Sequence, residues 1–274
     1  MFTVTSVQMI FRETIEENIE WIAATIKNTA NNGADAVLFP ECAVTGYVYD
    51  FAQLTPRTIH EALLYLSRTV SEAGCNVLVG SPTFEDGRLK NSLLIFNRKG
   101  KIIFQYSKIH LTPVDKQYFT PGDKLAFFHL DRIPCTAIIC HERRYPELVR
   151  IPVMMGAKIL FHPNAGLDDK AVSKAKRKGR DGIAVRAFEN AIYYVFSNSV
   201  GPQCEGKWSA GDSKIVAPDS SVLALADNRS ETVIQAQLDP NLATRQYAKE
   251  ALELPHFLQP YWKGMIEECQ RRLK

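Results

Sequence analysis

The sequence predicts an α/β domain in which helices cover mixed β-sheets. Short apolar segments typical of buried strands alternate with longer segments whose apolar residues recur at helical spacing. Two neighbouring apolar segments flank a short polar turn, which predicts a β-hairpin and therefore sheets that are not purely parallel. No stretch rich in Pro, Gly or Ser divides the chain, so we expect one domain over residues 1–250.

In the first half, the ends of the helices give the clearest local signals. Thr14 and Glu17 have the spacing of a capping box, and Pro56 suits the first turn of a second helix. Gly33 and Gly74 are placed to end these two helices. The expected elements are a strand at 2–9, a helix from about 14 to 33, a strand at 36–39, a helix at 56–74, a strand at 75–80, a hairpin of 92–97 with 101–106, and a strand near 125–131.

The second half continues the alternation after an apolar strand at 135–139. Pro152 lies within the helix expected to begin near Pro146 and should kink or shorten it, because proline lacks the N–H that an interior helical position donates. The expected elements are this helix, a strand at 158–162, a helix through about 170–190, a strand at 192–197, and strands near 213–217, 221–226 and 232–238.

The last segment, 251–274, is treated as a C-terminal extension because it brings apolar side chains after the core is complete. These side chains include Phe257, Tyr261 and Trp262 in a polar background. The extension either packs on its own domain or reaches across to a second subunit, and the sequence pattern alone leaves both possibilities open.

Composition and charge set broad limits on the class of protein. The chain has 274 residues, 46% apolar content and a net charge of +3 from 33 basic and 30 acidic residues, as in an ordinary globular protein. That balance does not suggest a nucleic-acid or membrane partner. With no signal peptide or long apolar run, we expect a cytoplasmic protein whose cysteines stay reduced, since they form no C-x-x-C pair.

Two other patterns are interpreted conservatively. The basic stretch at 170–180 could contact phosphates, but it has no interleaved aromatic residues and is better explained as a solvated helix face. His141, Glu142 and His162 lack the spacing of a metal site. We therefore expect no metal and no other cofactor.

Three reactive side chains lie where predicted strands end. Cys140 follows the apolar run 135–139, Glu41 follows 37–40, and Lys108 follows 102–107. Taken alone, Cys140 could be a small buried apolar residue. Because strand ends gather at one edge of an α/β sheet, the three could instead form a site. A carboxylate can take a thiol proton, the sulfur can attack an acyl carbon, and an ammonium can stabilise the oxyanion.

The segments around these residues resemble the nitrilase superfamily of carbon–nitrogen hydrolases. The matching blocks lie in the family's order at 39–41, 106–111, 118–123, 140–147 and 186–190, followed by Tyr193 and Asn198. The resemblance implies a catalytic triad of Glu41, Lys108 and Cys140. It also implies a four-layer αββα sandwich and a homodimer or higher homo-oligomer with exchanged C-terminal segments, which favours a subunit interface for 251–274.

One position departs from the family pattern. Many members carry a second glutamate seven residues before the glycine of an F-x-x-G motif, and here that position, counted back from Gly122, is Asp115. Aspartate keeps the charge but is one methylene shorter. Asp115 could therefore support Lys108 only if the loop at 112–117 lies closer; otherwise it is an ordinary loop acid.

The resemblance and the residue types lead to one reaction hypothesis. Glu41 takes the proton of Cys140, and the thiolate attacks the carbonyl carbon of a small amide or ureido substrate. Lys108 and the backbone N–H of His141 stabilise the oxyanion. Ammonia or an amine leaves, and water activated by Glu41 hydrolyses the thioester.

Substrate binding is predicted at His141, Arg143 and Arg144. The block at 140–147 is similar to that of N-carbamoyl amino acid amidohydrolases, in which arginine holds the substrate carboxylate. A guanidinium can bind a carboxylate through two parallel hydrogen bonds. The alternative is structural, because Arg143 lies four residues before Glu147 and could pair with it in a helix.

Two other functions remain open at this stage. A nitrile hydrolase would use the same triad, and a catalytically silent partner protein would keep the fold for assembly. The complete set of Glu41, Lys108 and Cys140 argues against the silent protein.

Overall fold

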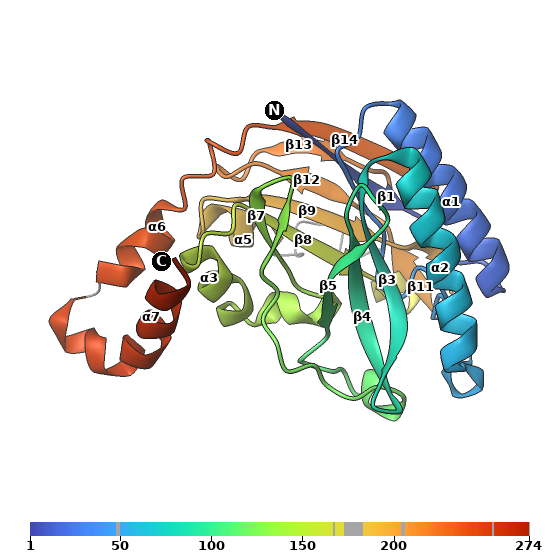
Figure 1. Ribbon diagram of the computed structural model, residues 1–274, viewed down its shortest axis with the longest axis horizontal. Coiled ribbons are helices and arrows are strands. Elements are labelled where there is room, and N and C mark those ends of the chain that lie inside the picture. Colours follow the sequence, from blue (N-terminus) through green and yellow to red (C-terminus); the bar gives the residue numbers. More distant parts are fainter. Residues whose placement is uncertain (48–49, 167, 173–182, 204–205, 254, 274) are drawn as a thin grey trace.

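Two six-stranded mixed sheets form the centre of the computed structural model (Figure 1). The structure describes all residues except 48–49, 167, 173–182, 204–205, 254 and 274. The strands of the first sheet are β1 (Phe2–Gln8), β2 (Ala36–Leu38), β3 (Asn76–Glu85), β4 (Arg88–Phe96), β5 (Ile102–Ser107) and β14 (Thr232–Leu238). Their order is β14-β1-β2-β3-β4-β5. The central β1, β2 and β3 are parallel, with Val4 opposite Ala36 and Val37 opposite Val77, and the outer pairs are antiparallel.

The second sheet repeats this arrangement in the order β13-β12-β9-β8-β7-β6. Its strands are β6 (Phe128–Leu130), β7 (Ile133–Ala137), β8 (Ile159–Asn164), β9 (Tyr193–Asn198), β12 (Lys214–Val216) and β13 (Val222–Leu225). A short ribbon of β10 (Val200–Pro202) and β11 (Trp208–Ala210) follows β9. The parallel pairs again lie in the middle, β7 with β8 and β8 with β9.

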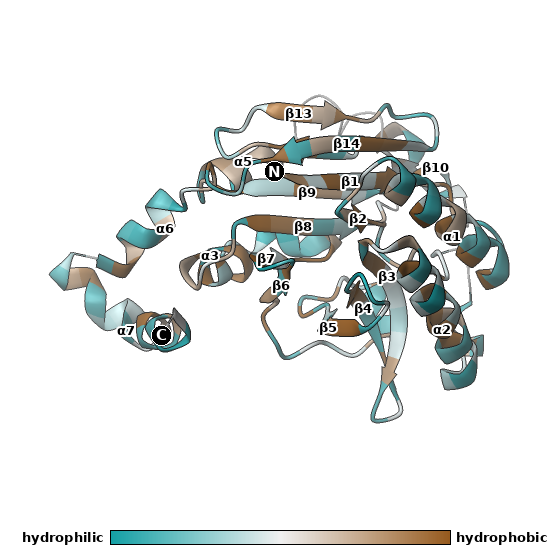
Figure 2. Ribbon diagram, turned by 45° about the horizontal axis from the view of Figure 1, so that its top comes forward, coloured by the Kyte–Doolittle hydropathy of each residue, from teal (hydrophilic) through white to brown (hydrophobic). Residues whose placement is uncertain are grey.

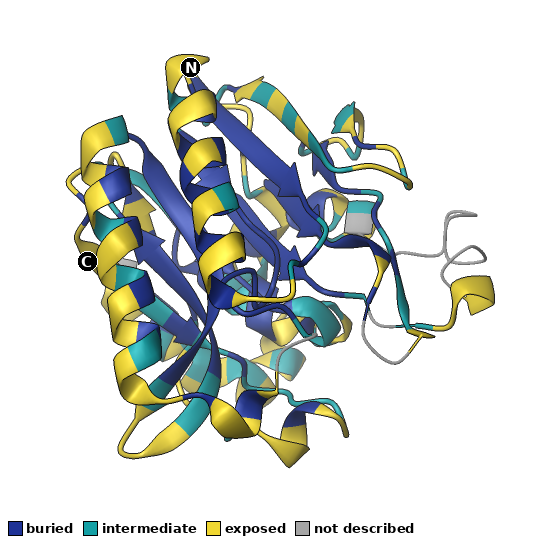
Figure 3. Ribbon diagram, turned by 90° about the vertical axis from the view of Figure 1, so that its right-hand side faces the viewer, coloured by how far each residue is buried: buried dark blue, intermediate teal, exposed yellow. Residues whose placement is uncertain are grey.

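The two sheets pack face to face, and helices cover their outer faces. Along β2, Ala36 and Leu38 face the opposite sheet, whereas Val37 faces the helices α1 (Ile15–Asn31) and α2 (Pro56–Ala73). Figure 3 shows these helices exposed on their outer side over buried strands. On the other sheet, α3 (Glu147–Met154) and α5 (Ile183–Phe188) cover the outer face. The predicted four-layer αββα sandwich is confirmed.

Local signals at the helix ends behave as expected. Thr14 and Glu17 form both hydrogen bonds of a capping box, and Pro56 occupies the first turn of α2. Gly74 closes α2 with a left-handed φ of 70°. The helix α3 ends two residues after Pro152, in agreement with the expected shortening. Residues 173–182, which include the middle of the helix expected at 170–190 and most of the basic stretch at 170–180, lie outside the described residues.

One hairpin was missed by the sequence reading, which ended the third strand at residue 80. In the structure β3 continues to Glu85 and pairs with β4 from Arg88 onward, around a turn at Asp86 and Gly87. Polar residues such as Ser81 and Asn91 hide this part of the hairpin from a hydropathy pattern, although both are buried. Asn91 is buried because its amide donates to Glu41 in the site described below.

The C-terminal segment leaves the sandwich beside α3 and returns to it only in part. It consists of α6 (Gln246–Glu250), two short 3-10 turns at 251–253 and 256–258, and α7 (Gln259–Leu273). Figure 2 shows α6 and α7 lying apart from the two sheets. Cys269 is fully buried against the α3 side of the core, whereas Phe257 and Tyr261 are 73% and 84% exposed. Interface packing of 251–274 stays a prediction. None of the helices in the described part of the chain has the length and apolar character needed to cross a membrane.

A single methyl group at Gly80 should destabilise the fold. An added Cβ would lie 2.3 Å from the Pro40 carbonyl oxygen and 2.7 Å from the Glu41 Cα atom, and neither backbone atom can move aside freely. We expect Gly80→Ala to lower the free energy of unfolding by about 1–3 kcal/mol, as is usual for overpacking. Denaturant unfolding followed by circular dichroism measures this change.

The matched control for this prediction is Gly264→Ala in α7, where an added Cβ meets nothing within 4 Å. Alanine is the better helix former, so this variant should be as stable as the parent or slightly more stable. Equal stability of the Gly80 and Gly264 variants would contradict the close approach at Gly80.

Candidate active site

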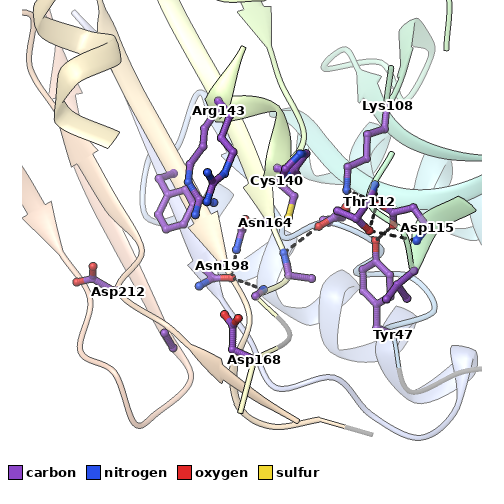
Figure 4. A pocket seen from close by; sticks show the side chains of 18 of the residues that line it. Tyr47, Lys108, Thr112, Asp115, Cys140, Arg143, Asn164, Asp168, Asn198 and Asp212 are labelled. Atoms are coloured by element: carbon purple, nitrogen blue, oxygen red, sulfur yellow. Dashed lines mark hydrogen bonds and ion pairs between the residues drawn. The ribbon is translucent and has the colours of Figure 1, made fainter. Parts of the chain in front are cut away.

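A cavity of about 520 Å³ opens at the edge of the sandwich where the predicted reactive residues meet. Glu41, Lys108, Asp115 and Cys140 all line it. Figure 4 shows Lys108 and Asp115 gathered on one side, with Cys140 beside them and Arg143 approaching from the other side. Strand ends distant in the sequence thus bring together the whole predicted set.

Lys108 is held between two carboxylates in the interior. Its Nζ lies 2.7 Å from Glu41 Oε1 and 2.8 Å from Asp115 Oδ2, and all three side chains are at most 2% exposed. Burial lowers the pKa of Lys108, but Glu41, Cys140 and Asp115 together raise it well above its ordinary value. The lysine is therefore a fixed ammonium.

Asp115 reaches Lys108 despite its short side chain because its loop lies close to the lysine. It begins a 3-10 turn, Asp115–Gln117, and its Oδ2 accepts hydrogen bonds from the Thr112 backbone N–H and hydroxyl at 2.9 and 2.8 Å. Burial raises the pKa of Asp115, but Lys108 and Thr112 lower it by a larger amount, so the net shift of the pKa is downward. The loop at 112–117 thus lies close enough for the shorter aspartate to contact Lys108.

The Glu41 carboxylate is fixed from several sides. The Asn91 amide donates to Oε1 at 2.8 Å, and the Ala165 backbone N–H donates to Oε2 at 3.0 Å. The Tyr47 hydroxyl lies 2.9 Å from Glu41 Oε1 and 3.1 Å from Asp115 Oδ1, so it bridges the two acids. Sequence reasoning missed Tyr47, Asn91 and Thr112, and no local pattern pointed to them.

Cys140 lies just after its strand rather than at the strand's last residue. The strand β7 ends at Ala137, and Cys140 opens a 3-10 turn, Cys140–Arg144, with a left-handed φ of 51°. Burial raises the pKa of the Cys140 thiol to about 12; Glu41 adds to this increase, whereas Lys108 opposes it. The resting sulfur is therefore a thiol that needs a base.

Glu142 ties the cysteine turn to the lysine segment. Its buried carboxylate accepts from the Ile139 N–H at 2.7 Å and from the Ile109 N–H at 2.6 Å, and the Tyr106 hydroxyl donates to it at 2.8 Å. Ile139 precedes Cys140 and Ile109 follows Lys108 in the sequence. One side chain thus sets the spacing between the two segments, a role that the sequence reading did not assign to Glu142.

Three further predicted residues lie on the cavity wall next to the cysteine. His141, Arg143 and Arg144 all line the cavity. Burial lowers the pKa of His141, and Lys108 and Arg144 lower it further. The backbone carbonyl of Arg143 accepts hydrogen bonds from Arg186 at 2.8 and 3.1 Å, which fixes the turn.

The alternative pairing of Arg143 with Glu147 is not observed in the described part of the chain. Arg143 belongs to the 3-10 turn and Glu147 begins α3, so the two are not in one helix. Within these described segments, no ion pair joins Arg143 or Arg144 to a carboxylate. Among the described residues, no group of three His, Cys, Asp or Glu side chains is arranged to hold a metal ion.

Comparison with known proteins gives consistent matches. Residues 3–248 match the model of the carbon-nitrogen hydrolase family. The chain is 30% identical over 233 residues to a nitrilase of Pyrococcus abyssi, covering 82% of this chain and 84% of the relative. It is 27% identical over 231 residues to the 2-oxoglutaramate amidase of Bacillus subtilis, covering 81% and 85%. The solved amidase of Nesterenkonia sp. AN1 superposes with a TM-score of 0.83 at 21% identity, over 96% of this chain and 100% of that one.

Replacing Glu41 with Gln should make the Cys140 thiol more acidic. The negative charge of Glu41 is among the causes that raise the pKa of Cys140, so a neutral side chain favours the thiolate. We expect the pH profile of Cys140 alkylation by iodoacetamide to move down by about one to three pH units. Alkylation rates measured by mass spectrometry across pH test this, with Cys140→Ala as the blank.

The matched control is Glu147→Gln, which changes an exposed glutamate that does not line the cavity. Its alkylation profile should coincide with that of the parent protein. An unchanged or upward-shifted profile for Glu41→Gln would contradict the electrostatic coupling between Glu41 and Cys140.

Proposed function

This chain belongs to the carbon-nitrogen hydrolase family and is an enzyme of that class, and we propose that it hydrolyses a small amide through a thioester on Cys140. The observation that carries this proposal is the shared cavity of Glu41, Lys108 and Cys140, in which Lys108 Nζ lies 2.7 Å from Glu41 Oε1. Each side chain supplies one function that acyl transfer requires: a base, a fixed positive charge and a nucleophile.

In the first half of the reaction, Glu41 takes the thiol proton as the Cys140 sulfur attacks the carbonyl carbon of the amide. The new C–S bond moves the carbonyl π electrons onto oxygen, and Lys108 and the His141 backbone N–H stabilise this oxyanion. When the tetrahedral intermediate collapses, the C–N bond breaks. Glu41 gives its proton to the leaving ammonia or amine, which restores the carboxylate.

In the second half, Glu41 takes a proton from water as the water oxygen attacks the thioester. The same oxyanion donors serve again, because the new tetrahedral centre forms at the same carbon. The C–S bond then breaks, the carboxylic acid product leaves, and the proton on Glu41 returns to Cys140. Asp115 acts through Lys108 by holding its ammonium in place at 2.8 Å.

We further propose that the preferred substrate bears a carboxylate, held by Arg143 or Arg144. Both arginines line the cavity near Cys140, and the relative from Bacillus subtilis is named for 2-oxoglutaramate, an amide that bears a carboxylate. N-carbamoyl amino acids share this chemistry. A nitrile remains the second candidate substrate, because the relative from Pyrococcus abyssi is named a nitrilase.

A homodimer that uses the segment 251–274 also remains part of the proposal. Phe257 and Tyr261 are largely exposed in the single chain, which agrees with cover by a second copy. A cytoplasmic location stays a prediction from the sequence.

Loss of the sulfur should abolish turnover. We expect Cys140→Ala to release no ammonia from any member of a panel of neutral amides, carboxylate-bearing amides, N-carbamoyl amino acids and nitriles. The parent protein should form hydroxamates with hydroxylamine and show a Cys140 acyl adduct by intact mass. A Cys140→Ala protein with full activity would overturn the thioester route, and a parent with neither adduct nor ammonia release would favour a silent protein.

Neutralising the arginines should affect only carboxylate-bearing substrates. We expect Arg143→Gln or Arg144→Gln to raise KM for such an amide on the order of 10- to 100-fold, the range for a lost hydrogen bond to a charged group. Steady-state kinetics on carboxylate-bearing and neutral amides of equal length separate the two effects.

The matched control for the arginine variants is Arg88→Gln, at the exposed first residue of β4 and outside the cavity. It should leave KM unchanged for both amides. If neutral and carboxylate-bearing amides lose affinity equally in the Arg143 and Arg144 variants, the carboxylate proposal is wrong.

A further inference from the structure

We propose that His162 and Tyr194 form a positioning pair that holds the peptide between Cys140 and His141 with its N–H facing the cavity. The proposal rests on the function proposed above, because that N–H is one of the two oxyanion donors. Neither His162 nor Tyr194 lines the cavity, so both would act through the peptide rather than on the substrate.

His162 forms a hydrogen bond through each of its two ring nitrogens. The residue lies in β8 and is fully buried. Its Nε2 is 2.9 Å from the Cys140 carbonyl oxygen, and its Nδ1 is 2.6 Å from the Tyr194 hydroxyl in the neighbouring strand β9. A carbonyl oxygen only accepts, so Nε2 carries a hydrogen and donates it to Cys140.

The protonation state fixes the rest of the chain of hydrogen bonds. Burial lowers the pKa of His162 well below its ordinary value, and the nearby Arg143 lowers it further. The imidazole is therefore neutral, with its one hydrogen on Nε2, and Nδ1 accepts a hydrogen bond from the Tyr194 hydroxyl. Tyr194 thereby selects the tautomer that can hold the Cys140 carbonyl.

The geometry of the peptide unit sets the direction of the His141 N–H. The described chain contains no cis peptide bonds, and in a trans peptide the C=O and the N–H point in opposite directions. Since the Cys140 carbonyl points at buried His162, the His141 N–H points away from it. Among the described residues the His141 N–H donates to no protein acceptor, and Cys140 and His141 both line the cavity.

The turn at Cys140 needs an anchor. Cys140 has a left-handed φ of 51°, a conformation that is strained for a residue with a side chain. Glu142 holds the Ile139 N–H before the cysteine at 2.7 Å, and His162 holds the carbonyl after it at 2.9 Å. The peptide unit that precedes Ile139 and the one that follows Cys140 are thus both held from the interior.

A test must separate positioning of the oxyanion donor from general support of the fold. Hydrolysis and the addition of an aldehyde to Cys140 both place negative charge on oxygen, whereas alkylation by iodoacetamide displaces iodide at a saturated carbon and forms no oxyanion. A positioning role predicts loss of the first two reactions only. A purely structural role predicts that all three decline together.

The variant of choice is His162→Leu, which removes the donor and keeps an apolar side chain. We expect kcat to fall on the order of 10- to 100-fold, less than or equal to the usual effect of deleting an oxyanion donor. The KM should stay unchanged. Inhibition by succinic semialdehyde should weaken by a similar factor; propionaldehyde replaces it if only neutral amides are hydrolysed. The rate of Cys140 alkylation by iodoacetamide should stay within about threefold of the parent rate.

Two companion variants keep the proposal falsifiable. In His162→Gln the side-chain amide N–H can replace Nε2–H and should restore most of kcat. Tyr194→Phe keeps the ring but loses the tautomer-selecting hydroxyl, so it should lower kcat without slowing alkylation, even if His162→Leu does not fold. Normal kcat in Tyr194→Phe and in a folded His162→Leu, or parallel loss of turnover and alkylation, would overturn the pair. Full activity of Cys140→Ala would instead overturn the underlying mechanism.

Discussion

The buried ammonium of Lys108 between two carboxylates is the interaction on which the site depends. A charge in the interior is tolerated only when oppositely charged and hydrogen-bonding groups surround it. Here Glu41 and Asp115 supply the charge, and Tyr47 and Asn91 hold the carboxylates. Because these groups come from segments far apart in the sequence, the cluster forms only when the first sheet and its edge loops are in place.

The same cluster determines the state of the nucleophile. Burial and the two acids raise the pKa of the Cys140 thiol more than Lys108 lowers it. The site therefore does not store a thiolate, unlike a cysteine paired with a positive charge alone. It keeps a thiol beside a fixed carboxylate, which agrees with the proposed mechanism, in which Glu41 takes the proton as the sulfur attacks the substrate.

The two sheets explain why the site lies at their shared edge. Their inner faces are filled by apolar side chains, and β1 and β9 are joined where the Ser6 hydroxyl donates to the Phe196 carbonyl and the Ser197 hydroxyl to the Val7 carbonyl. The reactive groups therefore lie in the segments that follow the strands, rather than in the strands themselves. In those segments, Glu142 bridges the lysine and cysteine segments. Rigid strands thus place the reactive groups, and short buried hydrogen bonds set their spacing.

The sequence by itself determined the alternation of elements, the helix ends such as the capping box at Thr14, and the positions of Glu41, Lys108 and Cys140 after their strands, because these signals are local. Only the tertiary structure decided which side chains hold them. Tyr47, Asn91 and His162 carry no local signal, since their partners Asp115, Glu41 and Cys140 lie 68, 50 and 22 positions away in the sequence. The hairpin at 81–91 was missed for a different reason: its buried polar residues, among them Asn91 against Glu41, interrupt the apolar pattern expected of a buried strand.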